Sequence, residues 1–163
     1  MPRPTPTRRR ALAASLAALA VPGLAGCARG VAVDAAPAAT DPLCADVVLA
    51  TPESLGEGLD RLPTDAQATT AWGGRTDPVV LRCGVEPLGP TAERCVAVET
   101  PGGPSVDWVV VEQDDGSWTF TTYGRVPAVE VLVPAAFAES RSTSFVPDLG
   151  PAVARAPAER SCL

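Results

Sequence analysis

Few of the side chains in this sequence are types that carry out chemistry. The chain contains no histidine and no lysine, and all 13 basic residues are arginine. This composition excludes a histidine-based nucleophilic triad and a lysine Schiff base. The sequence also lacks a Gly-x-Ser-x-Gly elbow, a P-loop and a Gly-x-Gly-x-x-Gly turn. Hydrolysis by a carboxylate pair stays open, and the candidates are Asp77, Asp107 and Glu130, each in or beside an expected strand. Such carboxylates more often lie on the surface or beside an arginine, so no catalytic residue is assigned.

Four charged residues stand among apolar positions of expected strands: Arg82, Asp107, Arg125 and Glu130. Buried charges are costly unless they are paired, so one interpretation is a set of ion pairs on the solvent face of a sheet. The other is a ligand cleft in which Arg82 or Arg125 holds an anionic group. Its aromatic walls would be Trp72, Trp108 and Tyr123. Aromatic residues at such positions are more often part of a core, which favours the ion-pair interpretation.

The first 27 residues have the features of a processing segment. A basic region with four arginines precedes an apolar run over 11–20, and Pro22-Gly23 then leads to Leu24-Ala25-Gly26-Cys27. The apolar run is shorter than the about 20 residues that a membrane span needs. Leu-Ala-Gly-Cys resembles the lipobox of bacterial lipoproteins, in which the cysteine is lipidated and exposed by cleavage. We therefore expect acyl chains on Cys27 and a protein anchored at the extracytoplasmic face of the bacterial cell membrane. An ordinary secretory signal is the alternative.

Apart from Cys27, the chain has four cysteines: Cys44, Cys83, Cys95 and Cys162. An even number in a small exported domain predicts two disulfides, for which three pairings are possible. A zinc site is the alternative, but the chain has no histidine and no Cys-x-x-Cys pair. The run Asp114-Asp115-Gly116 predicts a turn. A calcium site there is not expected, because no further calcium ligand stands at the required spacing. We expect no metal and no cofactor.

Composition divides the rest of the chain into a tether and one domain. Residues 28–42 are mostly Ala, Val, Pro, Gly and Thr without an amphipathic period, which predicts a tether. Residues 43–163 have a suitable length for a single domain. Without the four arginines of the basic region, the remaining nine basic residues face 19 acidic ones. An acidic domain repels nucleic acid and anionic lipid headgroups, so we expect neither as a partner surface.

The stretch 71–85 organises the expected sheet. Gly73-Gly74 predicts a turn, Pro78 can open a strand, and Val79-Val80-Leu81 predicts a buried strand. Segments 106–112 and 117–123 flank the turn 113–116, which predicts a hairpin with Trp118, Phe120 and Thr122 on one face. Further strands are expected over 95–98 and 126–133.

Helices are expected near both ends of this domain. Asp41-Pro42 supplies an N-cap and a proline at the first helical position, which predicts a short helix over 43–50. The spacing of Leu55, Leu59 and Leu62 predicts a further helical turn, and the polar segment 64–70 a loop. The run 149–156 can supply a last turn or helix. The sequence therefore predicts an α+β domain, an antiparallel sheet with helices mainly near the N- and C-terminal ends packed on one face.

Several of these segments together resemble a known family. They are Trp72-Gly73, the run Leu81-Arg82-Cys83-Gly84-Val85, Val106-Asp107-Trp108, 120–125 and 129–134. They are similar to the actinobacterial lipoproteins catalogued as domain of unknown function 3515, over about residues 44–134. The Trp-Gly-Gly-Arg-Thr-Asp-Pro turn is slightly longer than the usual Trp-Gly-x-Pro spacing. The resemblance implies an exported, membrane-anchored protein without assigned chemistry.

The resemblance also implies a disulfide pairing. In that family a cysteine like Cys44 and the Leu-Arg-Cys-Gly cysteine, here Cys83, occur together. This implies a Cys44–Cys83 bridge and leaves Cys95 and Cys162 to each other. The rival pairing joins Cys83 to Cys95 and Cys44 to Cys162, because chain termini often lie close together.

Two functions from different classes follow from the sequence. The first is a non-catalytic cell-envelope lipoprotein that binds an envelope protein or a wall component. The second is a small hydrolase of the cell envelope that uses carboxylates. The absence of histidine and lysine favours the first. Two carboxylates facing each other across about 5–10 Å would favour the second.

Overall fold

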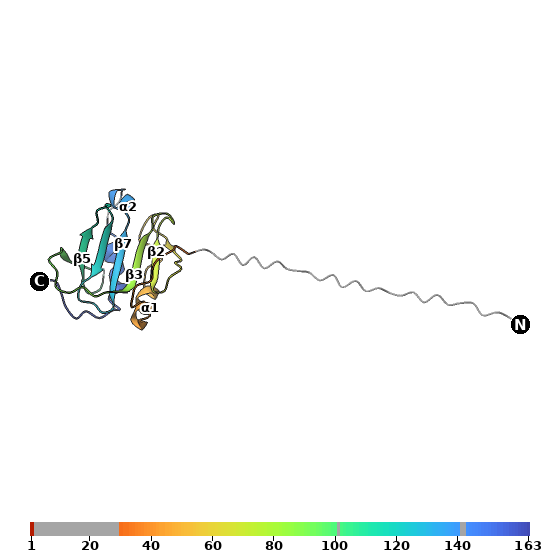
Figure 1. Cartoon of the computed structure of the whole chain (residues 1–163), viewed down its shortest axis with the longest axis horizontal. Helices are drawn as coiled ribbons and strands as arrows, with labels where there is room; N and C mark the ends of the chain where they lie inside the picture. Colours follow the sequence, from red (N-terminus) through yellow and green to blue (C-terminus); the bar gives the residue numbers. More distant parts are fainter. Residues whose placement is uncertain (2–29, 101, 141–142) are drawn as a thin grey trace.

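A computed structural model of the chain describes Met1 and residues 30–100, 102–140 and 143–163. Seven antiparallel strands form one open sheet in the order β1-β2-β3-β7-β6-β5-β4, with a few short helices around it (Figure 1). The strands are β1 (Arg61–Leu62), β2 (Thr69–Trp72), β3 (Val79–Val85), β4 (Cys95–Val98), β5 (Val106–Glu112), β6 (Trp118–Thr122) and β7 (Ala128–Val133). The helices are α1 (Pro42–Leu49), α2 (Ala135–Ser140), the 3-10 helix η1 (Val146–Leu149) and α3 (Gly150–Val153).

The main core lies on one face of this sheet, which we call the helix side. Trp72, Leu81 and Trp108 from the strands pack there against Val47 of α1 and Leu149 of η1. The opposite face, which we call the outer side, carries a smaller apolar cluster of Val31, Ala71 and Val80. β-Branched residues suit the pleated backbone, and their alternation along β3 supplies side chains to both clusters.

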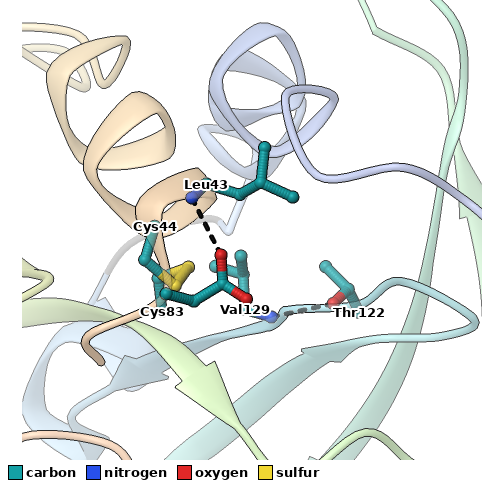
Figure 2. Close-up of a disulfide and its surroundings, with 6 residues drawn as sticks. Leu43, Cys44, Cys83, Thr122 and Val129 are labelled. Carbon is teal, nitrogen blue, oxygen red and sulfur yellow. Dashed lines mark hydrogen bonds between the residues drawn. A yellow bond between two sulfur atoms is a disulfide. The ribbon is translucent and has the colours of Figure 1, made fainter. Parts of the chain in front are cut away.

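The helix α1 begins as the sequence predicts and is tied to the centre of the sheet. The Oδ1 atom of Asp41 accepts a hydrogen bond from the Leu43 amide at 2.9 Å, and Pro42 occupies the first turn. A disulfide joins Cys44 of α1 to Cys83 of β3 (Figure 2). In the same region the Val129 amide donates to the Thr122 hydroxyl at 2.9 Å. The second disulfide joins Cys95 to Cys162, so both predicted pairs are present.

The strand predictions are largely confirmed. β5 and β6 pair as the predicted hairpin, with Val110 opposite Phe120. Trp118 packs against the helix-side core and Phe120 is part of it, as the alternation predicts. Gly73 and Gly116 have positive φ at the two predicted turns, a conformation that glycine adopts without steric cost.

The predicted helical turn over 55–62 is wrong. The Leu55 amide donates to the Leu59 carbonyl, and a β-bridge joins Ser54 to Asp60, so the chain forms a tight loop. Positive φ at Gly56 and Gly58 favours this loop over a helix. Leu55 and Leu59 are buried in the core. Two buried leucines four residues apart give the same pattern as one face of a helix, which is why the sequence predicted one there. The predicted loop over 64–70 also ends early, because β2 begins at Thr69.

The predicted tether over 28–42 requires the larger correction. Described residues from Gly30 to Asp41 lie against the sheet, and Val31, Ala36 and Ala39 are buried. Backbone groups of this segment bond to the domain, as in the 2.9 Å hydrogen bond from the Ala38 amide to the Gly84 carbonyl. We call residues 30–41 the N-terminal strap. The folded domain therefore includes the strap and does not begin at residue 43.

Gly84 tests the packing of the strap. Its φ is +94°, and a Cβ there would lie 2.4 Å from the Ala38 carbonyl carbon. Gly84→Ala should lower the free energy of unfolding by about 1–3 kcal/mol or more, measured by urea denaturation. Gly89→Ala is the matched control, because nothing lies within 4 Å of a Cβ there, and should change stability by less than about 0.5 kcal/mol. Equal effects of the two substitutions would contradict the close approach of the strap.

Candidate functional site

The aromatic walls of the predicted cleft belong largely to the core. Trp72 and Trp108 are fully buried on the helix side. The Trp72 indole Nε1 donates to the Pro52 carbonyl at 2.9 Å, and Trp108 meets Phe120 edge to face with ring centroids 6.4 Å apart. A buried indole whose N–H has a partner stabilises a core and presents no surface to a ligand. The cleft interpretation is wrong for these two residues.

Arg82 and Glu130 form an ion pair on the outer side of the sheet. They stand opposite each other on β3 and β7, and two guanidinium nitrogens of Arg82 lie 3.0 and 2.5 Å from Glu130 Oε1. Their side chains are 25% and 16% exposed. Opposite charges directly across two strands typically stabilise a sheet by about 0.2–1 kcal/mol. This is the ion-pair arrangement that the sequence analysis offered against a cleft, although the pair is half-buried.

The remaining predicted cleft residues hold the C-terminal tail. The Asp107 carboxylate accepts from the Cys162 amide at 2.7 Å, beside the Cys95–Cys162 disulfide. Arg125 is 5% exposed and donates to the Ala156 carbonyl. Burial lowers the pKa of the Arg125 guanidinium, and the nearby Asp107 carboxylate offsets this only in part. An arginine still stays charged. Tyr123 faces the guanidinium of Arg160, whose Cζ lies 6.0 Å from the ring centroid.

The three candidate carboxylates are not gathered at one site. Glu130 is engaged by Arg82, and Asp107 by the C-terminal tail. Asp77 is exposed in the turn before β3. This arrangement gives no specific support to the hydrolase hypothesis.

A pocket of about 410 Å³ lies over β4, β5 and β6 on the helix side, and the sequence analysis did not predict it. Its lining residues are Arg94, Val96, Val98, Val110, Trp118, Phe120, Ala138 and Thr143. The register explains the gathering, because Val96 pairs with Trp108 and Val110 with Phe120, which aligns alternate residues of three strands on one face. We call this hollow the β4–β6 pocket.

Among the described residues, the helices cover the β4–β6 pocket only in part. α1 packs on β3 and on α3, so it covers the β3 side of the sheet. Over β4–β6, the residues beyond the strands that line the pocket are Arg94, Ala138 of α2 and Thr143. Val96, Val98 and Trp118 are half-buried there, although each carries a large apolar side chain. The sequence shows the apolar alternation of β4, but it does not show how far the helices cover that face of the sheet.

The chemistry of the β4–β6 pocket suits binding. Of the eight lining residues that the structure describes, six are apolar and two are polar, the exposed Arg94 and Thr143. Within the part of the chain that the structure describes, the Arg94 side chain forms no ion pair. The volume of the β4–β6 pocket is within the range of about 300–1,000 Å³ that is typical of ligand sites. None of these eight described residues is a carboxylate, cysteine or histidine that could act as a base or nucleophile.

Two further expectations concern the membrane and metals. The proposed lipid attachment at Cys27 lies outside the described residues, as does the whole predicted signal segment. Of the helices described, each is too short or too polar to cross a bilayer. Among residues 30–100, 102–140 and 143–163, we found no group of three or more His, Cys, Asp or Glu side chains suited to a metal ion.

Comparison with known proteins places the chain in a family. A family model described as "Protein of unknown function (DUF3515)" matches residues 11–162. The match extends the resemblance seen over 44–134 to nearly the whole chain. Searches among curated proteins and among solved structures found no match.

Arg125→Ala tests whether this residue holds the C-terminal tail. Removing the guanidinium leaves the Ala156 carbonyl without its donor, which should cost about 1–3 kcal/mol. Hydrogen exchange should quicken at the Glu159 and Arg160 amides, which bond to the Gly124 carbonyl. Arg155→Ala removes the same charge from an exposed site and should leave both amides protected. Unchanged protection in Arg125→Ala would show that the tail is held without it.

Proposed function

The chain belongs to the DUF3515 family, whose description assigns no activity, and on this premise we propose that it is a lipid-anchored, non-catalytic binding module of the bacterial cell envelope. The proposal has two parts, an anchor at Cys27 and a ligand site in the β4–β6 pocket. The protein would stand on the extracytoplasmic face of the cell membrane.

The anchor is supported by the N-terminal sequence and by cysteine use in the domain. Four arginines, an apolar run and Leu24-Ala25-Gly26-Cys27 follow each other in the order of a lipoprotein signal. The two disulfides favour an oxidising compartment, since such bonds are rare in the reducing cytosol. Two or more acyl chains suffice for stable anchoring.

The β4–β6 pocket is the observation that carries the binding role. Valine, tryptophan and phenylalanine side chains dominate its lining, and sugars would require more polar partners than Arg94 and Thr143 offer. An apolar side chain of an envelope protein therefore fits the pocket better than a wall glycan. β4 is also an edge strand of the sheet, so an extended segment of the partner can pair with its free edge.

Cys27→Ala tests the anchor. The variant has no thiol to acylate, so it should move from the membrane fraction to the soluble fraction. The measurement is immunoblotting of both fractions together with the intact mass of the wild-type chain, which should show the added acyl groups. Cys27→Ala recovered in the membrane fraction in the wild-type amount would falsify lipid anchoring at this residue.

Val98→Asp tests the β4–β6 pocket. On the Cys27→Ala chain, N-acetyl-leucinamide should shift NMR signals of β4 and β5 amides, and Val98→Asp should weaken this binding at least about tenfold, or about 1.4 kcal/mol. Ala97→Asp is the matched control, because Ala97 is exposed on the same strand and does not line the pocket. N-acetylglucosamine serves as the wall probe. Shifts with this sugar and none with the leucine probe would favour a wall component as the ligand.

A further inference from the structure

The N-terminal strap is fastened to the domain from its first described residues. The Val31 amide donates to the Pro63 carbonyl at 2.7 Å, and the Asp65 amide donates to the Val31 carbonyl at 3.1 Å. The Val33 amide donates to Asp65 Oδ1 at 2.9 Å. Val31 is also buried against Ala71 and Val80 on the outer side of the sheet. The domain thus holds the chain at residue 31 through both backbone and apolar contacts.

Gly30 is enclosed as well. A Cβ at this position would lie 2.6 Å from the backbone carbon of Thr64 and 2.8 Å from the nitrogen of Asp65. The chain is therefore in contact with the domain three residues after Cys27. Three residues span at most about 11 Å when fully extended, whereas a free tether up to residue 42 would span about 50 Å. The distance between the anchor and the folded domain is short.

From this distance we infer that the domain rests directly on the bilayer, with one defined surface toward the lipid headgroups. The inference depends on the proposed lipid anchor at Cys27. The surface, which we call the anchor-side surface, comprises residues 30–32, 64–65 and 75–78. The strap residues Val31 and Ala32 share one shallow depression with the turn 75–78, so these segments lie together on the domain. Acyl chains on Cys27 would hold this surface within about 11 Å of the lipid-bearing residue.

The β4–β6 pocket is then turned away from the membrane. Val31 packs on the outer side of the sheet, whereas the pocket opens on the helix side. Val31 packs on β2 and β3 with Leu132 of β7 beside it, whereas the pocket lies over β4–β6, at the other end of the strand order. Figure 1 shows the same separation, with the strap entering on the β2 side and the C-terminus on the β5 side. The pocket therefore meets partners from the envelope space and not lipids of the anchoring bilayer.

Site-specific photocrosslinking in membranes tests this orientation. The full chain carries p-benzoylphenylalanine in place of Ala32 on the anchor-side surface, or in place of Glu99 after β4. Both positions are exposed, so the probe fits at either one. After irradiation, mass spectrometry should find phospholipid adducts at position 32 and only background at position 99.

A linker insertion supplies the matched control. About 12 Gly/Ser residues placed between Arg29 and Gly30 add a mean reach of about 20 Å and should reduce the adducts at position 32 to background. Membrane-bound chain without adducts at position 32, or with equal adducts at positions 32 and 99, would overturn the inference and leave the lipid anchor intact. Chain absent from the membrane fraction would overturn both.

Discussion

The close approach of Ala38 to Gly84 is the contact on which the arrangement of the N-terminal half depends. Only a residue without a side chain leaves room there, and the register between β3 and β7 shifts at the same point. The strap can therefore cross the end of β3 and pass from the outer side of the sheet to α1 on the helix side. Cys83, the neighbouring residue, is bonded to Cys44 immediately afterward. Gly84 and Cys83, two adjacent residues of β3, thus hold the strap on the outer side of the sheet and α1 on the helix side.

The sequence revealed elements whose signals are local. The cap at Asp41, the hairpin of β5 and β6 and the alternation of Trp118 and Phe120 follow from neighbouring residues alone, and each is present. The strap escaped prediction because its alanines and valines lack a period and are ordered by backbone bonds to distant residues. The loop over 55–62 was mistaken for a helix because Leu55 and Leu59 are buried in the core, whichever backbone conformation carries them.

The candidate site shows the same division between local and tertiary information. Sequence alternation correctly separated the faces of the strands, but it does not say what covers a face. Arg82 and Glu130 find each other across β3 and β7, while Asp107 and Arg125 bind a tail more than 30 residues away. Their partners were therefore invisible to a reading of each strand alone. Among the described residues, the short helices cover the β4–β6 end of the sheet only in part, and the pocket lies there.

The fastening of the C-terminal tail has a practical consequence for handling this protein. A disulfide joins Cys162 to Cys95 at the start of β4, so Leu163 lies near Cys95. The residue before Cys95 is Arg94, which lines the β4–β6 pocket. An affinity tag or reporter appended at Leu163 would begin next to the edge strand and occupy space that a partner needs. The proposed cleavage before Cys27 would remove a tag at the other end. The exposed hairpin turn at Asp114 and Asp115 is the safer insertion point for a label.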